Sequence, residues 1–214
     1  MCVKATDTTN NSNTQCSGPY KIDKIAPTVT ALSTNVSSVC AGGTATISWS
    51  ATDTGGSGLN RTELWANSGS GWAIVSGCSS SPCTVTVSAT TQYGVHAIDN
   101  AGNCINESGG HCGGVSSDSV SRSAVGPDTV TALSAPGAPG NPTYSDTTQN
   151  GTKVSWTAGS GAVSYGLYRC EGVGCAKPGS SWDNVTSPYT DGSLNCNTTY
   201  RYWTEARNSC GSAT

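Results

Sequence analysis

The sequence predicts an all-β protein made of tandem β-sandwiches, and three observations support this prediction. Short segments alternate apolar and polar residues, which is the period of a half-buried strand. The stretches between them are rich in turn-forming residues, and the 214 residues include 27 Gly and 9 Pro. The chain also has 11 Cys, more than a reducing compartment supports unless the thiols bind metal. We therefore expect many short strands whose loops are held by disulfides.

Composition also excludes two classes of partner. Only 11% of the residues are charged and the net charge is −3, so we expect no basic surface for nucleic acid or acidic lipid. No apolar run approaches the roughly 20 residues that a membrane span requires, so this segment is not expected to insert into a membrane. Because Phe is absent, 6 Trp and 8 Tyr must supply the aromatic part of the core.

The first 24 residues resemble a later part of the same chain. The segment "VKATDTTNN" (Val3–Asn11) is similar to "VHAIDNAGN" (Val95–Asn103), which places Asp7 where Asp99 lies in the later segment. We therefore expect residues 1–24 to be the terminal hairpin of a preceding domain or of a domain in a partner molecule. An isolated hairpin is marginally stable in water, so this hairpin needs such a partner.

Residues 25–134 are expected to form one sandwich. In "TATISW" the side chains of Ala45, Ile47 and Trp49 point the same way, and turn-rich stretches such as "DTGGSG" and "NAGNC" separate the apolar segments. Seven short strands at this spacing are typical of an immunoglobulin-like sandwich. The seven expected strands are Thr28–Ser33, Thr44–Ala51, Thr62–Asn67, Gly71–Gly77, Thr84–Ala89, Tyr93–Asp99 and Ser117–Val125.

Three motifs in this region make the resemblance more specific. "APTVTALS", "ISWSATDTGGSGLNRTELW" and "YGVHAIDNAGN" resemble the bacterial immunoglobulin-like repeats that occur in tandem on large secreted and surface proteins. The hexapeptide "TVTALS" recurs at 129–134, which favours a tandem organisation. The resemblance implies a fold but no ligand, because such folds serve many functions.

Residues 135–214 resemble a fibronectin type III domain. The segments "GTKVSWTAGSGAVSYGLYRC" and "TTYRYWTEARNSCGSA" carry the likeness. It implies that Trp156 lies on the second strand, that Tyr165 lies on the third, and that Tyr200 is the corner tyrosine before the long sixth strand. Along that strand Tyr202, Thr204 and Ala206 share a face with Tyr200. We expect the last strand of this sandwich to be lacking.

The cysteines are expected to form disulfides between sequence neighbours. No CxxC motif occurs, and the two histidines, His96 and His111, do not lie at zinc-site spacing. Cys40 is left over, either as a free thiol, as the partner of a residue outside this sequence, or as an interchain bridge. The expected pairs are Cys2 with Cys16, Cys78 with Cys83, Cys104 with Cys112, Cys170 with Cys175, and Cys196 with Cys210.

Three aspartates form a candidate calcium site. Asp53 and Asp99 follow expected strands whose loops lie at the same end of the sandwich, and Asp23 lies in the linker that approaches that end. Calcium takes six to eight oxygen ligands, which carboxylates supply. The alternative is that each aspartate only hydrogen-bonds its own turn. Calcium is the only cofactor that the sequence suggests.

Seven sequons provide candidate glycosylation sites. Attached glycans would solubilise and shield the surface, but in an ordinary bacterium most of these sites would be bare. The candidate asparagines are Asn10, Asn35, Asn60, Asn106, Asn150, Asn184 and Asn197.

The sequence predicts a non-catalytic extracellular module. No Gly-x-Ser-x-Gly motif of a serine nucleophile occurs, and no pair of carboxylates is placed for acid–base catalysis. Disulfides would also remove most of the thiols as nucleophiles. We expect a stalk or fibre-forming segment of an exported, secreted or cell-surface protein. Its partners would be neighbouring domains of one long chain, or identical subunits joined by strand addition.

Two alternatives stay open at this point. The chain is an adhesin module that binds glycan or protein through loops such as "CEGVGCAKPGSSW", or it links the domains of a secreted hydrolase. Four tryptophans bear on the adhesin alternative, because each is either a core residue or part of an exposed platform for sugar: Trp65, Trp72, Trp182 and Trp203.

Overall fold

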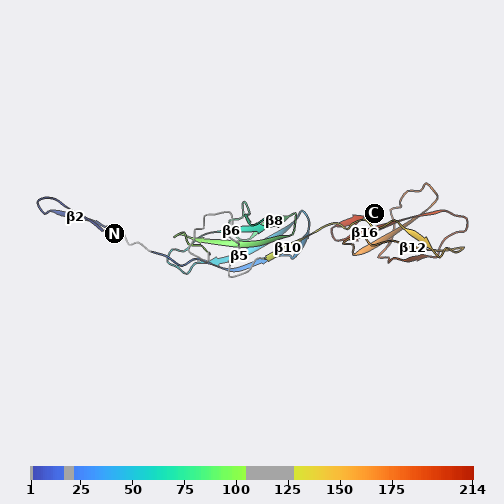
Figure 1. Cartoon of the computed structure of the whole chain (residues 1–214), viewed down its shortest axis with the longest axis horizontal. Coiled ribbons are helices and arrows are strands. Elements are labelled where there is room, and N and C mark those ends of the chain that lie inside the picture. Colours follow the sequence, from blue (N-terminus) through green and yellow to red (C-terminus); the bar gives the residue numbers. More distant parts are fainter. Residues whose placement is uncertain (1, 17–21, 105–127) are drawn as a thin grey trace. The chain divides into compact units, whose positions relative to one another are not determined.

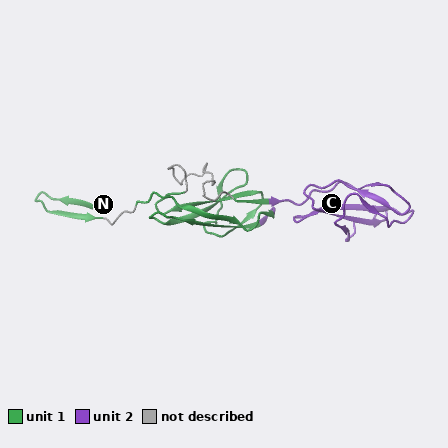
Figure 2. Ribbon diagram, turned by 90° about the horizontal axis from the view of Figure 1, so that it is seen from below, with its two compact units in different colours: residues 1–39, 44–131 green, residues 40–43, 132–214 purple. Residues whose placement is uncertain are grey.

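A computed structural model describes residues 2–16, 22–104 and 128–214 of the chain. These residues form strands and loops without a helix, which confirms the all-β fold class (Figure 1). The described part of the chain therefore offers no helix long and apolar enough to cross a membrane. The chain divides into two compact units, one of residues 1–39 and 44–131 and the other of residues 40–43 and 132–214 (Figure 2).

The first element is a two-stranded hairpin. Strands β1 (Cys2–Thr6) and β2 (Ser12–Cys16) pair in antiparallel register from Cys2 opposite Cys16 to Thr6 opposite Ser12. A disulfide joins Cys2 to Cys16 at the open end of the hairpin. All ten strand residues are exposed, including Val3 at 66%. The hairpin thus presents an apolar side chain to solvent, and the membership of residues 1–24 in a further domain stays a prediction.

Two sheets form the sandwich of the first unit. The smaller has the order β3-β5-β8, and the indole Nε1 of Trp49 on β5 donates to Thr62 Oγ1 on β6 of the other sheet at 2.9 Å. The larger has the order β4-β10-β9-β6-β7. Their strands are β3 (Thr28–Thr34), β4 (Ser38–Cys40), β5 (Gly43–Thr52), β6 (Leu59–Asn67), β7 (Ala73–Ile74), β8 (Cys83–Val87), β9 (Thr91–Asp99) and β10 (Asp128–Leu133). The last residue of β4, the first residue of β5 and the end of β10 belong to the second unit.

The period-two pattern of the sequence correctly identifies the buried face of β5. Ala45, Ile47 and Trp49 are all buried, as predicted, while the residues between them are less buried. Strand β9 is buried on both faces over most of its length, and it lies between β10 and β6 inside the larger sheet. These residues make the core against which the loops at the end of the sandwich are fixed.

Some strand predictions were wrong or incomplete. The expected strand at Gly71–Gly77 is reduced to the two residues of β7, and β4 was not predicted. The expected strand at Ser117–Val125 lies outside the described residues. The two copies of "TVTALS" occupy different places: residues 28–33 lie in β3, whereas 129–133 lie in β10, which pairs with β9. Equal sequences therefore do not mark equivalent strands here.

The second unit is also built from two sheets around one apolar cluster. The sheets have the orders β11-β12-β15 and β14-β13-β16-β17, and their shared core contains Val154, Trp156, Leu167 and Tyr202. The strands are β11 (Thr143–Ser145), β12 (Thr152–Ser155), β13 (Ser164–Glu171), β14 (Trp182–Asp183), β15 (Tyr189–Asp191), β16 (Tyr200–Asn208) and β17 (Gly211–Ala213).

The prediction that the last strand is lacking was wrong, because β17 pairs with the end of β16 over three residues. Two predictions about β16 hold. Tyr202, Thr204 and Ala206 are buried on its inner face. The hydroxyl of Tyr200 accepts a hydrogen bond from the backbone N–H of Asn195 at 3.0 Å, the contact typical of a corner tyrosine.

The outer face of β13 and β16 carries a charged network. Glu205 on β16 receives hydrogen bonds from Lys177, from Arg207 Nε at 2.8 Å and from the hydroxyl of Tyr168 at 3.0 Å. The ammonium of Lys177 lies 4.0 Å from the ring centroid of Tyr168. Tyr168 is buried although it lies on the outer face of the sheet, because these charged side chains cover it.

Candidate metal centre

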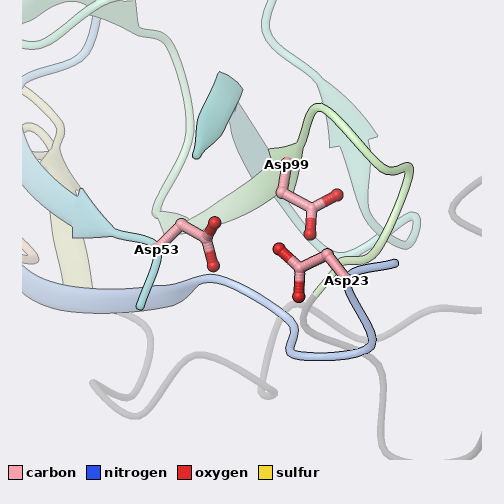
Figure 3. A group of neighbouring side chains, drawn as sticks. All are labelled: Asp23, Asp53 and Asp99. Atoms are coloured by element: carbon pink, nitrogen blue, oxygen red, sulfur yellow. The ribbon is translucent and has the colours of Figure 1, made fainter. Parts of the chain in front are cut away.

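Three carboxylates from separate loops of the first unit converge on one point (Figure 3). Asp23 lies in the segment before β3, Asp53 directly follows β5, and Asp99 is the last residue of β9. One oxygen from each lies within 4.8 Å of the others. The structure thus brings together the three residues that the sequence predicted to gather at one end of the sandwich.

Asp99 is the buried member of the group, with none of its surface exposed. Its Oδ1 accepts hydrogen bonds from the N–H groups of Ala101 at 2.8 Å and Asn103 at 2.7 Å, and its Oδ2 accepts one from Asn103 Nδ2 at 2.7 Å. Burial alone would raise the pKa of Asp99, but the hydrogen bonds from Asn103 outweigh it and hold the pKa below its usual value. The buried carboxyl group is therefore ionised at neutral pH.

Asp23 is held by the loop between β5 and β6. Its Oδ1 accepts the N–H of Ile25 at 2.9 Å, and its Oδ2 accepts both the N–H of Ser57 at 2.8 Å and the Ser57 hydroxyl at 2.7 Å. The hydrogen bond from Ile25, followed by those from Ser57, lowers the pKa of Asp23. The carbonyl oxygen of Asp23 also accepts a hydrogen bond from Asn103 Nδ2 at 3.1 Å.

The loop that contains Asp53 depends on glycine. Asp53 accepts hydrogen bonds from the N–H groups of Gly55 at 3.0 Å and Gly58 at 2.8 Å. A Cβ atom on Gly55 would lie 2.2 Å from Oδ2 of Asp23, far inside van der Waals contact. Gly58 has a φ of 78°, a left-handed conformation that favours glycine. The "GGSG" sequence therefore lets the backbone approach the carboxylate of Asp23.

The donor set fits a hard divalent cation. Within the described residues no Lys or Arg forms an ion pair with Asp23, Asp53 or Asp99, so their charges are stabilised by hydrogen bonds alone and not by a cationic side chain. Carboxylate oxygens that accept one N–H keep a further lone pair for a ligand. Calcium prefers such oxygen ligands.

Sequence reasoning missed Ser57 and Asn103, whose side chains link the three loops. The polar residues within "GGSG" and "NAGN" were the available signal.

The hairpin contains a copy of the Asp99 loop. Asp7 Oδ1 accepts the N–H groups of Thr9 and Asn11, each at 2.9 Å, and Asp7 Oδ2 accepts Asn11 Nδ2 at 3.2 Å. This matches the pattern around Asp99, and a left-handed residue follows in each loop, Asn10 at φ 67° and Gly102 at φ 85°. Asp7 is exposed and does not belong to the cluster of Asp23, Asp53 and Asp99, so the loop takes this form outside that cluster.

Three of the five predicted disulfides are present, namely Cys2–Cys16, Cys78–Cys83 and Cys170–Cys175. Cys104 is disulfide-bonded, and its predicted partner, Cys112, lies outside the described residues. The Cys196–Cys210 pairing was wrong, as was the prediction that Cys40 is left over. Cys40 instead pairs with Cys210 at a Cα–Cα distance of 5.4 Å, and Cys196 is a free, exposed thiol.

Strand length explains this error. Cys196 precedes β16 and Cys210 follows it, and a nine-residue strand separates its two ends by roughly 25–30 Å. A disulfide requires Cα atoms within about 7 Å of one another. Residues close in sequence are therefore too far apart to pair when a fully extended strand lies between them.

The other candidate residues are also placed by the structure. Six of the seven sequon asparagines are exposed, and Asn106 lies outside the described residues; the exposed ones are Asn10, Asn35, Asn60, Asn150, Asn184 and Asn197.

Two of the four tryptophans, Trp65 and Trp182, lie in or against a core, whereas Trp203 lies on the outer face of β16 with Arg201 5.0 Å above its ring. Trp65 is buried, Trp72 and Trp203 are half-buried, and Trp182 packs against the core while its ring stacks on Tyr189 with a centroid distance of 5.6 Å. His96 is half-buried on β9 and lies edge-on to the Trp65 ring, whereas His111 lies outside the described residues.

Comparisons with known proteins give no family for this chain. No protein-family model and no curated protein sequence matches it. Among solved structures, a crystal structure of titin domains is 16% identical, with a TM-score of 0.45, and covers 100% of this chain and 70% of the titin segment.

Two further structures show a similar level of likeness. The FN1–FN3 domains of chicken CNTN1 are 14% identical, with a TM-score of 0.38, covering 99% of this chain and 70% of that one. A two-domain fibronectin type III segment of chicken tenascin is 17% identical, with a TM-score of 0.36, covering 87% and 94%. The all-β fold class of this protein is accordingly assigned from the strands and sheets of its own structure.

Proposed function

We propose that this chain is a non-catalytic structural module of an exported protein and that its β-sandwich units form part of a stalk or fibre. The observation that carries the proposal is the set of disulfides that fix loops and strand ends in both units. Disulfides persist in oxidising environments, which supports a secreted or cell-surface location. Fixed loops resist fraying and proteolysis, which a load-bearing extracellular segment requires.

The polar groups of the described residues support a structural role. His96 contacts Glu63 and the ring of Trp65, and Asp191 is bound by Arg169 and by the hydroxyl of Tyr202 at 2.6 Å. Each of these groups is engaged inside a sandwich and serves its packing. The adhesin alternative gains no support from Trp182, because this ring packs on the core.

The redox state of the thiols in the native source tests the proposal. Protein trapped with an alkylating reagent before lysis is analysed by mass spectrometry with and without reductant. We expect Cys78, Cys83, Cys170 and Cys175 to be protected until reductant is added, and Cys196 to be alkylated at once. Alkylation of all these thiols without reductant would place the protein in a reducing compartment and contradict the exported role.

Calcium at the aspartate centre is the second part of the proposal. Asp23, Asp53 and Asp99 would hold the ion, which would neutralise their charges and fix the segment before β3 to the loops after β5 and β9. A ligand that binds only the folded state stabilises it by RT ln(1 + [L]/Kd), so saturation at about 100 times Kd adds about 2.7 kcal/mol.

Thermal unfolding in calcium and in EDTA tests this site. We expect calcium to raise the Tm of the wild type and to leave the Asp53→Asn variant unchanged. Asp7→Asn is the matched control, because Asp7 makes the same loop hydrogen bonds as Asp99 but lies apart from the other two aspartates. An equal Tm of the wild type in calcium and in EDTA would show that the three aspartates serve only their own loops.

A further inference from the structure

The Cys40–Cys210 disulfide encloses most of the protein in a covalent ring. Cys40 ends β4, Cys210 lies in the turn between β16 and β17, and 170 positions of sequence separate them. The ring includes strands β5 to β16, and therefore most strands of both units. The three other disulfides in which both cysteines are described close rings of only 5 or 14 positions.

Hydrogen bonds place both cysteines against the same short segment. The N–H of Ala41, next to Cys40, donates to the carbonyl of Leu133 at 2.8 Å. The side-chain amide of Asn208 donates to the carbonyl of Ser134 at 2.9 Å, and Asn208 Oδ1 accepts the N–H of Cys210 at 2.8 Å. The carbonyl groups of Leu133 and Ser134 thus hold the segment next to Cys40 and the segment next to Cys210, respectively.

We propose that this disulfide is a force bypass that shields residues 41–209 from tension. A pull applied before Cys40 and after Cys210 passes through the S–S bond, because this bond is the shortest covalent path between the two points. The strands inside the ring then carry no net extension along the backbone. The inference rests on the proposed load-bearing role, since a shield against tension serves only a protein that is pulled.

The expected lengths are easily distinguished. With the disulfide intact, the extensible chain between Cys16 and Cys40 has about 24 residues and contributes roughly 80 Å of contour. Opening the disulfide adds the 170 enclosed positions, which extend by roughly 560–610 Å.

Reduction of the Cys40–Cys210 disulfide opens the ring. A dithiol reagent supplies two electrons and two protons, Cys40 and Cys210 become thiols, and the reagent becomes a disulfide.

Single-molecule force spectroscopy of the full chain, pulled by handles at its two ends, tests the proposal. We expect the oxidised protein to lengthen by no more than about 100 Å before the handles detach. The Cys40→Ser/Cys210→Ser double variant should release the long contour in unfolding steps without reductant. The Cys78→Ser/Cys83→Ser double variant is the control and should behave as the oxidised wild type, because its ring is only five positions wide.

Long unfolding steps in the oxidised wild type would overturn the proposal. A Cys196–Cys210 pairing would give such steps, because it would leave the chain before Cys196 free to extend. If the double variant does not fold, the wild type with and without reductant supplies the same comparison. A second readout is covalent: one backbone nick between residues 41 and 209 must leave both fragments joined until reductant is added. These experiments use purified protein, so their failure is distinct from finding the protein in a reducing compartment.

Discussion

The carboxylate of Asp23 lies so close to the backbone of Gly55 that a Cβ atom on Gly55 would be 2.2 Å from its Oδ2. This approach brings Ser57 within hydrogen-bonding distance of Asp23, although 34 positions of sequence separate them. The segment before β3 is therefore attached to the loop after β5 by a contact that a Cβ atom on Gly55 would displace.

Replacing Gly55 by alanine is expected to push Asp23 out of this position. The added methyl group would overlap the carboxylate of Asp23, which must shift and give up its hydrogen bonds from Ser57, and overpacking of this kind typically costs about 1–3 kcal/mol of the free energy of unfolding. Chemical denaturation measures the change. Gly56→Ala is the matched control, because a Cβ atom on Gly56 would meet nothing within 4 Å. Equal stabilities of the two variants would show that Asp23 moves away at no cost.

Glu205 is expected to make the second unit sensitive to acid. Burial alone would raise the pKa of Glu205, but hydrogen bonds from Lys177, Arg207 and Tyr168 lower it from 4.5 to about 2. Since the folded pKa lies below the unfolded one, this contribution to stability is present above pH 4.5 and is lost as the pH falls toward 2.

The Glu205→Gln variant measures that contribution. We expect it to be less stable than the wild type by about 1–3 kcal/mol at pH 7, because hydrogen bonds to a charged group are lost. The difference should shrink between pH 4.5 and pH 2 in denaturation experiments. Glu171→Gln, at an exposed position on β13, is the control. A difference that does not change with pH would mean that the charge of Glu205 is not stabilising.

Cys196 is expected to be the reactive thiol among the described residues. It is exposed and outside any disulfide, whereas Cys40 and Cys210 are bonded to each other. Maleimide labelling of the native protein, followed by peptide mapping, should modify the peptide that contains Cys196 and leave Cys40 unmodified. Labelling should disappear in the Cys196→Ser variant. A label on Cys40 in the native wild type would instead support the pairing predicted from sequence proximity.

The corner tyrosine offers a test of the second sandwich. Tyr200→Phe removes the hydroxyl that accepts the N–H of Asn195 at 3.0 Å, so we expect a loss of about 0.5–1.5 kcal/mol in the free energy of unfolding. Tyr144→Phe is the control, because this exposed side chain uses its ring, against Tyr202, rather than its hydroxyl. Equal losses in both variants would mean that the Tyr200 hydroxyl adds no specific stability.

Residue patterns predicted the local features of the fold well. Ala45, Ile47 and Trp49 alternate with polar residues, and this alternation suffices to identify the buried face of β5. The three-residue β4 is too short to show a period, and β7 has only two residues. The aspartate cluster could be predicted because each residue adjoins a strand end, whereas the contribution of Asn103, which bonds both Asp99 and Asp23, depends on the fold.

The sequence by itself determined the all-β class, the strands with a clear alternation, the three short-range disulfides and the end of the sandwich where the aspartates gather. Only the tertiary structure decided that Cys40 pairs with Cys210 and that Cys196 stays free. The physical reason is that strand periodicity and turn formation act between near neighbours in sequence. The pairing of distant cysteines depends instead on how the packed sheets bring remote segments together, and an extended strand separates the cysteines that sequence proximity suggests.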